Sequence, residues 1–461
     1  MVVVFVLAAL LVVGVLVTAN WYVWRRLFRD TTRAPGPVRR IGAAVIAGGW
    51  VLTVGALVAE RAGAPFWLQR VLAWPGFLWL ALSLYLLLAV LAGDIVRPLL
   101  RRYLERRAAA RQAWATTGVE TSASPVAADE RIPAGTAPPQ TSDTPDAPQT
   151  SDTPDTPKAP DTPSSRTTGT TEGADGSDAG AASPLARPSR RLFVSRVVAG
   201  AAAAAAVGTV GYGTYGVLSG PKVKRVTVPL ARLPRAAHGF RIAVVSDIHL
   251  GPVLGRGFAQ QVVDTINSTQ PDLVAVVGDL VDGSVKDLGP AAAPLSQLKA
   301  RHGAYFVTGN HEYFSGAEQW VAEVRRLGLL PLENARTELP HFDLAGVNDV
   351  AGEDEGQGPD YARALGDRDR SRACVLLAHQ PVQIHDAVDH GVDLQLSGHT
   401  HGGQLWPGNL IARAANPTVA GLERYGDTQL YVSRGAGAWG PPTRVGAPSD
   451  ITVIELASRK A

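Results

Sequence analysis

Hydrophobic positions are spread very unevenly along the 461-residue chain. Apolar stretches long enough to cross a bilayer, which takes about 20 residues, begin near residues 1, 41, 74 and 197. The chain is strongly polar between the third and fourth stretches, and beyond residue 222 short apolar runs alternate with amphipathic stretches. We therefore expect a membrane region over 1–112 with three transmembrane helices, then a polar linker, a fourth apolar helix and a folded domain. Their expected bounds are about 1–20, 41–59 and 74–93 for the three helices, 113–189 for the linker, 190–219 for the fourth helix and 222–461 for the domain.

The pattern after residue 222 is typical of an α/β domain. Runs such as FRIAVV, DLVAVV and ACVLL have the length and continuous apolar character of strands that are buried on both faces. Amphipathic stretches such as RGFAQQVVDTINS separate them, so we expect a sheet covered by helices. Asp, His or Asn follows each of five such runs. Ligands bind at the carboxyl ends of strands in these folds, so a functional site is expected there.

Arginine clusters predict the orientation of the chain in a membrane. They lie at 25–40, between the first two apolar stretches, at 97–111, after the third, and at 187–196, before the fourth. Because positively charged loops stay in the cytoplasm, the N-terminus and everything after residue 219 are expected outside. The central parts of the stretches carry no charged residue, which argues against a transporter or channel.

Composition narrows the function further. The linker is rich in Pro, Thr, Ser and Asp, which predicts a disordered cytoplasmic tether. Basic residues flank the apolar stretches instead of gathering on the folded domain, so nucleic-acid binding is not expected. The single cysteine, Cys374, excludes an intramolecular disulfide and a thiolate metal cluster.

Five short motifs follow one another at the predicted strand ends. They are DIH at 247–249, GDLVD at 278–282, GNHE at 309–312, the histidine of LLAHQP at 379 and GHTH at 398–401. In this order they resemble the motif blocks of the calcineurin-like metallophosphoesterases, in particular a membrane-anchored bacterial branch similar to the twin-arginine-exported phosphodiesterases. The resemblance covers about 222–461 and implies a layered β-sandwich flanked by helices, in the order α-β-β-α.

The resemblance also implies a site for two divalent metal ions. Asp247, His249 and His401 would hold the first ion, Asn310, His379 and His399 would hold the second, and Asp279 would bridge both. His311 is expected to be a catalytic residue that either stabilises the transition state or protonates the leaving oxygen, oriented by Asp282. Carboxylate, imidazole and amide ligands without sulfur suit Mn, Fe or Zn.

The expected function is that of a membrane-anchored, extracytoplasmic phosphoesterase. By resemblance it would hydrolyse phosphoesters, phosphodiesters first among them, by in-line attack of metal-bound hydroxide. Phospholipids, cell-envelope phosphodiesters and nucleotides are candidate substrates outside the cell. The alternative is a metal-binding membrane sensor that signals without turnover.

Paired arginines, Arg190 and Arg191, precede the fourth apolar stretch in the sequence SRRLFVSR. This resembles a twin-arginine export signal, although it lies in the middle of the chain. A site built from five strand ends exists only after folding, so export of the folded domain by the twin-arginine machinery would allow metal to bind first. No clear cleavage site follows, and we therefore expect a signal anchor in the plasma membrane of a bacterium.

Overall fold

A computed structural model describes residues 2–117 and 190–459. Contacts divide the chain into two units, residues 1–101 with 189–461 and residues 102–188, and each is described by itself. The predicted linker lies outside the described residues except for 113–117, which are helical instead of disordered.

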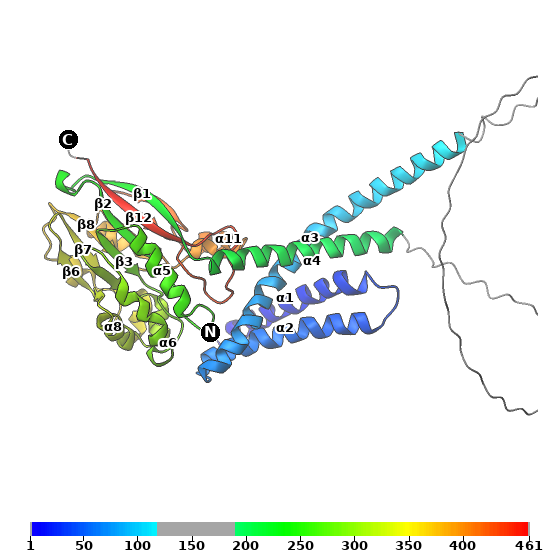
Figure 1. The fold of residues 1–461 in the computed structure, drawn as a ribbon, viewed down its shortest axis with the longest axis horizontal. Helices are drawn as coiled ribbons and strands as arrows, with labels where there is room; N and C mark the ends of the chain where they lie inside the picture. Colours follow the sequence, from blue (N-terminus) through cyan, green and yellow to red (C-terminus); the bar gives the residue numbers. More distant parts are fainter. Residues whose placement is uncertain (1, 118–189, 460–461) are drawn as a thin grey trace, which may run out of the picture. The chain divides into compact units, whose positions relative to one another are not determined.

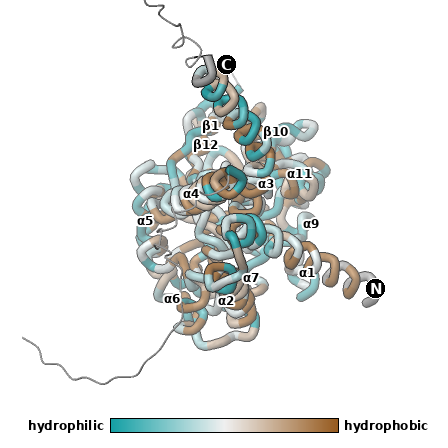
Figure 2. The backbone as a smooth tube through the Cα atoms, turned by 90° about the vertical axis from the view of Figure 1, so that its right-hand side faces the viewer, coloured by the Kyte–Doolittle hydropathy of each residue, from teal (hydrophilic) through white to brown (hydrophobic). Residues whose placement is uncertain are grey.

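Four long helices account for the apolar stretches: α1 (Val2–Trp24), α2 (Pro37–Arg61), α3 (Phe66–Thr117) and α4 (Arg190–Leu218) (Figure 1). Three of them, over Pro37–Arg61, Phe66–Trp114 and Arg190–Leu218, are long and apolar enough to cross a membrane. Figure 2 colours their apolar residues brown. The first predicted span corresponds to α1, and its crossing stays a prediction. Helix α3 is much longer than the third predicted span, 74–93. The residues that follow this span include Leu, Arg, Ala and Gln, which favour helix, so the helix continues beyond its apolar part.

Charged side chains gather at one end of these helices. Arg26 lies 3.0 Å from Asp30 and 2.6 Å from Asp94, and Asp94 lies 3.1 Å from Arg97 of the same helix, α3. The Nε of Arg196, in the second turn of α4, donates a hydrogen bond to the carbonyl of Thr31 (3.0 Å). The α1–α2 connection, this part of α3 and the start of α4 therefore lie together.

Two six-stranded sheets form the domain, in the orders β1-β12-β2-β3-β4-β5 and β10-β11-β9-β8-β7-β6. The strands of the first sheet are β1 (Lys222–Leu230), β2 (Phe240–Val245), β3 (Leu273–Val277), β4 (Ala304–Val307), β5 (Leu330–Pro331) and β12 (Asp450–Ser458). Those of the second are β6 (Ala335–Glu338), β7 (Phe342–Gly346), β8 (Ala373–Leu377), β9 (Leu394–Ser397), β10 (Gly421–Tyr425) and β11 (Thr428–Val432). Neighbouring strands are parallel from β2 to β5 and from β7 to β9, and β9 is also parallel to β11.

One apolar core lies between the two sheets and includes Ile242, Phe342, Leu394 and Tyr431, all fully buried. Two further cores cover the outer faces, one around Trp320 beside the first sheet and one around Leu365 beside the second. The helices of the domain are α5 (Arg256–Ser268), α6 (Val285–Ala292), α7 (Asn310–Ser315), α8 (Ala317–Arg326), α9 (Tyr361–Leu365), α10 (Ile384–Asp389) and α11 (Gly408–Ala415). The predicted layered α/β fold is confirmed.

Candidate metal centre

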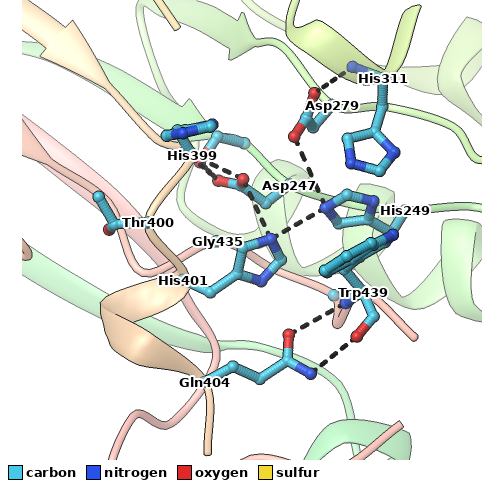
Figure 3. A network of polar contacts seen from close by, with 12 residues as sticks. Asp247, His249, Asp279, His311, His399, Thr400, His401, Gln404, Gly435 and Trp439 are labelled. Atoms are coloured by element: carbon cyan, nitrogen blue, oxygen red, sulfur yellow. Dashed lines mark hydrogen bonds and ion pairs between the residues drawn. The ribbon is translucent and has the colours of Figure 1, made fainter. Parts of the chain in front are cut away.

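The five motifs meet because parallel strands end at one edge of each sheet. Strands β2, β3, β4, β8 and β9 end at residues 245, 277, 307, 377 and 397, and a predicted site residue follows each within two or three positions. Figure 3 shows side chains that follow β2, β3, β4 and β9 pointing toward one another. The sandwich thus turns five separate loops into one cluster of polar groups.

The residues predicted for the first ion lie together. Asp247, His249 and His401 each offer a ligand atom, and these atoms lie within 4.8 Å of one another. The Nε2 atoms of His249 and His401 are 2.9 Å apart, and Nε2 of His401 is 3.3 Å from Asp247 Oδ1. All three residues are buried. These atoms could therefore hold one metal ion.

The residues predicted for the second ion form a neighbouring group. Asp279, His379 and His399 offer ligand atoms within 4.8 Å of one another, and Asn310 Oδ1 lies 3.0 Å from His399 Nδ1. Asp279 Oδ2 is 3.1 Å from His379 Nε2 and 3.8 Å from His249 Nε2. This carboxylate therefore lies between the two groups, in the position predicted for a bridging ligand.

His379 supplies a test of whether these residues fit a metal. Its Nδ1 lies 2.8 Å from the carbonyl oxygen of Val277 and donates to it, which leaves the Nε2 lone pair directed into the site. That Nε2 is buried and makes no hydrogen bond with the described residues; its neighbour is Asp279 Oδ2, which lies 3.1 Å away but is not aligned for one. A buried ring nitrogen that faces a carboxylate in this way is suited to share a metal ion with it. The donor set, nitrogen and oxygen without sulfur, fits a divalent ion of the Mn, Fe or Zn type.

Asp282 holds two imidazole rings. Its Oδ1 accepts hydrogen bonds from Nδ1 of His311 at 2.7 Å and Nδ1 of His249 at 2.9 Å. Burial opposes the charge on His311, but the Asp282 carboxylate outweighs it and raises the pKa of His311 to about 9. Burial also acts on Asp282, yet the two histidines hold its pKa at about 2. His311 can therefore present a protonated Nε2 to the site while Asp282 stays charged.

The other buried groups divide by charge. Burial lowers the pKa of His399 to about 4 and takes that of His401 well below its usual value. Burial also opposes the charges of Asp279 and His379, but their mutual attraction outweighs it, lowering the pKa of the first and raising that of the second. Without an ion, the centre thus combines two neutral imidazoles, His399 and His401, with the charged pair of Asp279 and His379, and a bound cation would take the place of the proton on His379.

Backbone strain marks the same positions. Among the predicted metal-binding residues, φ lies between 49° and 72° at five: Asp247, His249, Asp279, His399 and His401. Residues other than glycine rarely adopt this left-handed region, and such strain persists where the surrounding structure imposes it. Two glycines allow the close approach. A Cβ on Gly309 would lie 2.3 Å from Asp279 Oδ1, and one on Gly398 would lie 2.4 Å from Asp247 Oδ2.

Glu312 has a role that the sequence did not reveal. Its buried carboxylate accepts hydrogen bonds from the backbone N–H groups of Gly309 (2.6 Å), Leu280 (2.7 Å) and Asp279 (3.0 Å). It thereby ties the β3 loop to the β4 loop. The only signal in the sequence is its place as the last residue of the GNHE motif.

Residues far away in the sequence complete the surroundings. The His311 ring lies between two exposed aromatic rings, with centroid distances of 5.5 Å to Phe314 and 5.7 Å to Trp439. Glu60 of α2 and Phe77 of α3 line a small cavity that also includes His249 and Asp282. Nothing in the sequence pattern connects these two membrane-helix residues with the site.

Comparison with known proteins agrees with this geometry. Residues 240–403 match the family model described as calcineurin-like phosphoesterase. The chain is 38% identical over 259 residues to the transmembrane protein with metallophosphoesterase domain of Danio rerio, covering 53% of this chain and 59% of that protein. It thus spans about three fifths of that relative.

Two bacterial relatives are matched over nearly their whole length. One is an uncharacterized metallophosphoesterase of Aquifex aeolicus, 33% identical over 243 residues, with 52% of this chain and 92% of the relative covered. The other is the uncharacterized metallophosphoesterase YkuE of Bacillus subtilis, 30% identical over 284 residues, with 59% and 99% covered. On these matches, together with the five motifs and the sandwich that gathers them, the chain belongs to the calcineurin-like phosphoesterase family.

Proposed function

We propose that this protein is a membrane-anchored, extracytoplasmic phosphoesterase that uses two divalent metal ions of the Mn, Fe or Zn type. One observation carries the proposal: the seven predicted ligands converge on two adjoining groups, and the Asp279 carboxylate lies between them, 3.1 Å from His379 Nε2 and 3.8 Å from His249 Nε2. Phosphodiesters are the preferred substrates in this proposal.

Two divalent ions bound there would clamp the phosphoryl group and generate a nucleophile from water near neutral pH. Two residues of the chain would supply the proton for the leaving group. Asp282 holds His311 through Nδ1, so that the opposite nitrogen faces the site and carries the proton. His311 then gives that proton to the leaving oxygen, which is general acid catalysis. Asp282 keeps the ring oriented and supports its charge.

The reaction can be tested on the full-length chain purified in detergent and loaded with Mn. We expect hydrolysis of an aryl phosphodiester, with at least a hundredfold loss in Asp279→Asn and His311→Ala. Asp264→Asn, which changes an exposed carboxylate of α5, is the matched control. Full activity in both site variants would refute the assignment of the site. Mn binding without turnover in the wild type would favour the sensor instead.

Helix contacts support the extracytoplasmic location. The arginine-rich α1–α2 connection and the start of α4 lie together at one end of the helices, whereas Glu60, near the other end of α2, lies beside the domain. Positive charge marks the cytoplasmic end. An impermeant thiol reagent should label Leu330→Cys in intact cells, and Gly36→Cys only after permeabilisation. The reverse pattern would refute this orientation.

We further propose that α4 is a twin-arginine signal anchor. Arg190 and Arg191 are exposed at its first turn, where a receptor could read them. Replacing both by lysine should block display of the domain outside the cell while leaving the helices upstream in the membrane. Unchanged surface labelling of Leu330→Cys in that background would refute the export route.

A further inference from the structure

The segment that follows the GHTH motif exposes large apolar side chains beside the metal centre. All eight residues of α11 are partly or fully exposed, and Leu410 and Ile411 are 61% and 77% exposed. Trp406, just before the helix, is 53% exposed. A short helix that carries bulky apolar residues outward is typical of a membrane interface.

Contacts with the membrane helices show what this segment faces. The hydroxyl of Tyr85 in α3 donates a hydrogen bond to the carbonyl of Trp406 (2.9 Å). Leu405 packs against the cluster formed by Tyr85 of α3 and by Ala206 and Val210 of α4. The exposed apolar surface of 406–411 is therefore continuous with the surface of two membrane helices.

The position of Tyr85 gives the depth of the contact. It lies nine residues before Asp94, which belongs to the charged cluster at the far end of the helices. Nine residues of helix span about 14 Å, and the hydrocarbon core is about 30 Å thick. Trp406 therefore lies about halfway through the hydrocarbon core, within the membrane and not above it.

The same segment is joined to the catalytic residues. Gln404 and Trp439 exchange two hydrogen bonds, of 2.9 and 3.0 Å, and the Trp439 ring lies against His311 (Figure 3). Phe77 of α3 borders the cavity at His249 and Asp282, which is also lined by Ala438 and Gly440, the two neighbours of Trp439. Aromatic side chains thus line the way from the leaflet to the proton donor.

We infer that the substrate is a membrane lipid whose headgroup phosphoester reaches the metal centre from the leaflet, while Trp406, Leu410 and Ile411 insert among the acyl chains. This inference rests on the proposed phosphoesterase function. Hydrolysis breaks one P–O bond. The oxygen of water joins the phosphorus, and the leaving alcohol oxygen takes a proton, so water is the only co-reactant. Binding of a soluble phosphoester would not be strengthened by an apolar rim that continues into the bilayer. A lipid, in contrast, could keep its acyl chains among other lipids while its headgroup is bound at the metal centre.

Insertion can be measured without activity. The only native cysteine, Cys374, is buried, so a cysteine introduced on the surface can be labelled selectively. Ile411→Cys should carry a fluorophore that nitroxide-labelled acyl chains quench several-fold in proteoliposomes of phosphatidylethanolamine and phosphatidylglycerol. Leu330→Cys is the control, because Leu330 is 47% exposed but pairs with Tyr305 toward the amino ends of the strands, away from the metal centre. Equal quenching at both positions would overturn the inference.

Hydrolysis of lipid and of a soluble substrate should also respond differently to the loss of this apolar surface. In Mn-loaded proteoliposomes, Leu410→Ser combined with Ile411→Ser should lower lipid hydrolysis at least tenfold and leave hydrolysis of a soluble aryl phosphodiester unchanged. Leu330→Ser should change neither rate. A wild-type protein that cleaves the aryl ester but none of phosphatidylethanolamine, phosphatidylglycerol or phosphatidic acid would overturn the lipid inference alone. Cleavage of neither class with Mn bound would instead overturn the proposed function.

Discussion

Removal of the Glu312 side chain should destabilise the domain far more than removal of an ordinary surface carboxylate. Glu312→Ala leaves the backbone N–H groups of Gly309, Asp279 and Leu280 without their common acceptor. Each buried donor left unpaired costs about 1–3 kcal/mol, so three would cost roughly 3–9 kcal/mol. Water entering the vacated volume can satisfy some of them, and we therefore expect a loss near the lower end, about 3 kcal/mol.

A loss of this size is a large fraction of a typical unfolding free energy of about 5–15 kcal/mol. It can be measured by denaturant unfolding of the full-length protein in detergent, after metal removal by a chelator. Glu318→Ala is the matched control, since Glu318 is an exposed residue of α8 whose carboxylate lies 3.2 Å from Gln357 Nε2. Surface changes of that kind usually alter stability by less than about 0.5 kcal/mol.

The two variants should also differ in metal binding. The three N–H groups belong to the loops that carry Asp279 and Asn310, so Glu312→Ala should weaken Mn binding at least tenfold, whereas Glu318→Ala should not. The reasoning would be refuted if Glu312→Ala lost less than about 1 kcal/mol and bound Mn as tightly as the wild type.

Further predictions concern charge, space and metal. His311 acts when protonated, so kcat/KM should fall as the pH rises through the pKa of His311. Asp282→Asn should move this alkaline fall in kcat/KM to lower pH by about 1–2 units, toward the ordinary pKa of a histidine. An unchanged pH profile would contradict the pairing of His311 with Asp282. Gly398→Ala places a Cβ 2.4 Å from Asp247 Oδ2, and a titration should find at least tenfold weaker Mn binding; unchanged binding would mean that this contact does not position Asp247. Chelation should abolish phosphodiester hydrolysis and Mn should restore it; a metal-free protein that keeps its rate would argue against metal catalysis altogether. Finally, Glu60→Gln removes a negative charge beside the site, so kcat/KM should rise a few-fold for a dianionic phosphomonoester relative to a phosphodiester, and an unchanged ratio would mean that Glu60 does not face the substrate.

Much of the fold could be predicted from the sequence, for a physical reason. Strands buried on both faces are continuously apolar, so FRIAVV and ACVLL are visible without any alignment. Because parallel strands place their carboxyl ends at one edge, polar residues after each run could also be expected to meet. The structure brings these residues to within a few ångströms of one another.

Other parts of the site depend on long-range geometry that local pattern does not encode. Glu60 and Phe77 reach the cavity because of how the membrane helices pack against the domain. The left-handed backbone at Asp247 and His401 is imposed by the surrounding loops, since residues other than glycine rarely adopt it. The full length of α3 cannot be predicted from hydropathy either, because hydropathy detects the apolar part of a helix and not its polar continuation.

The pairing of the first and last strands has a consequence for the order of events during synthesis. Strand β1 begins four residues after α4 ends, yet its neighbour in the sheet is β12, which lies between β1 and β2 and ends at Ser458. The first strand made is therefore among the last to find its partner. Until the ribosome has added residue 450, β1 and the edge of β2 that pairs with β12 can form backbone hydrogen bonds only with each other or with water. The sheet can close only after β12 has been made, so any machinery that handles this domain as a folded body must wait until residue 458 has been synthesised.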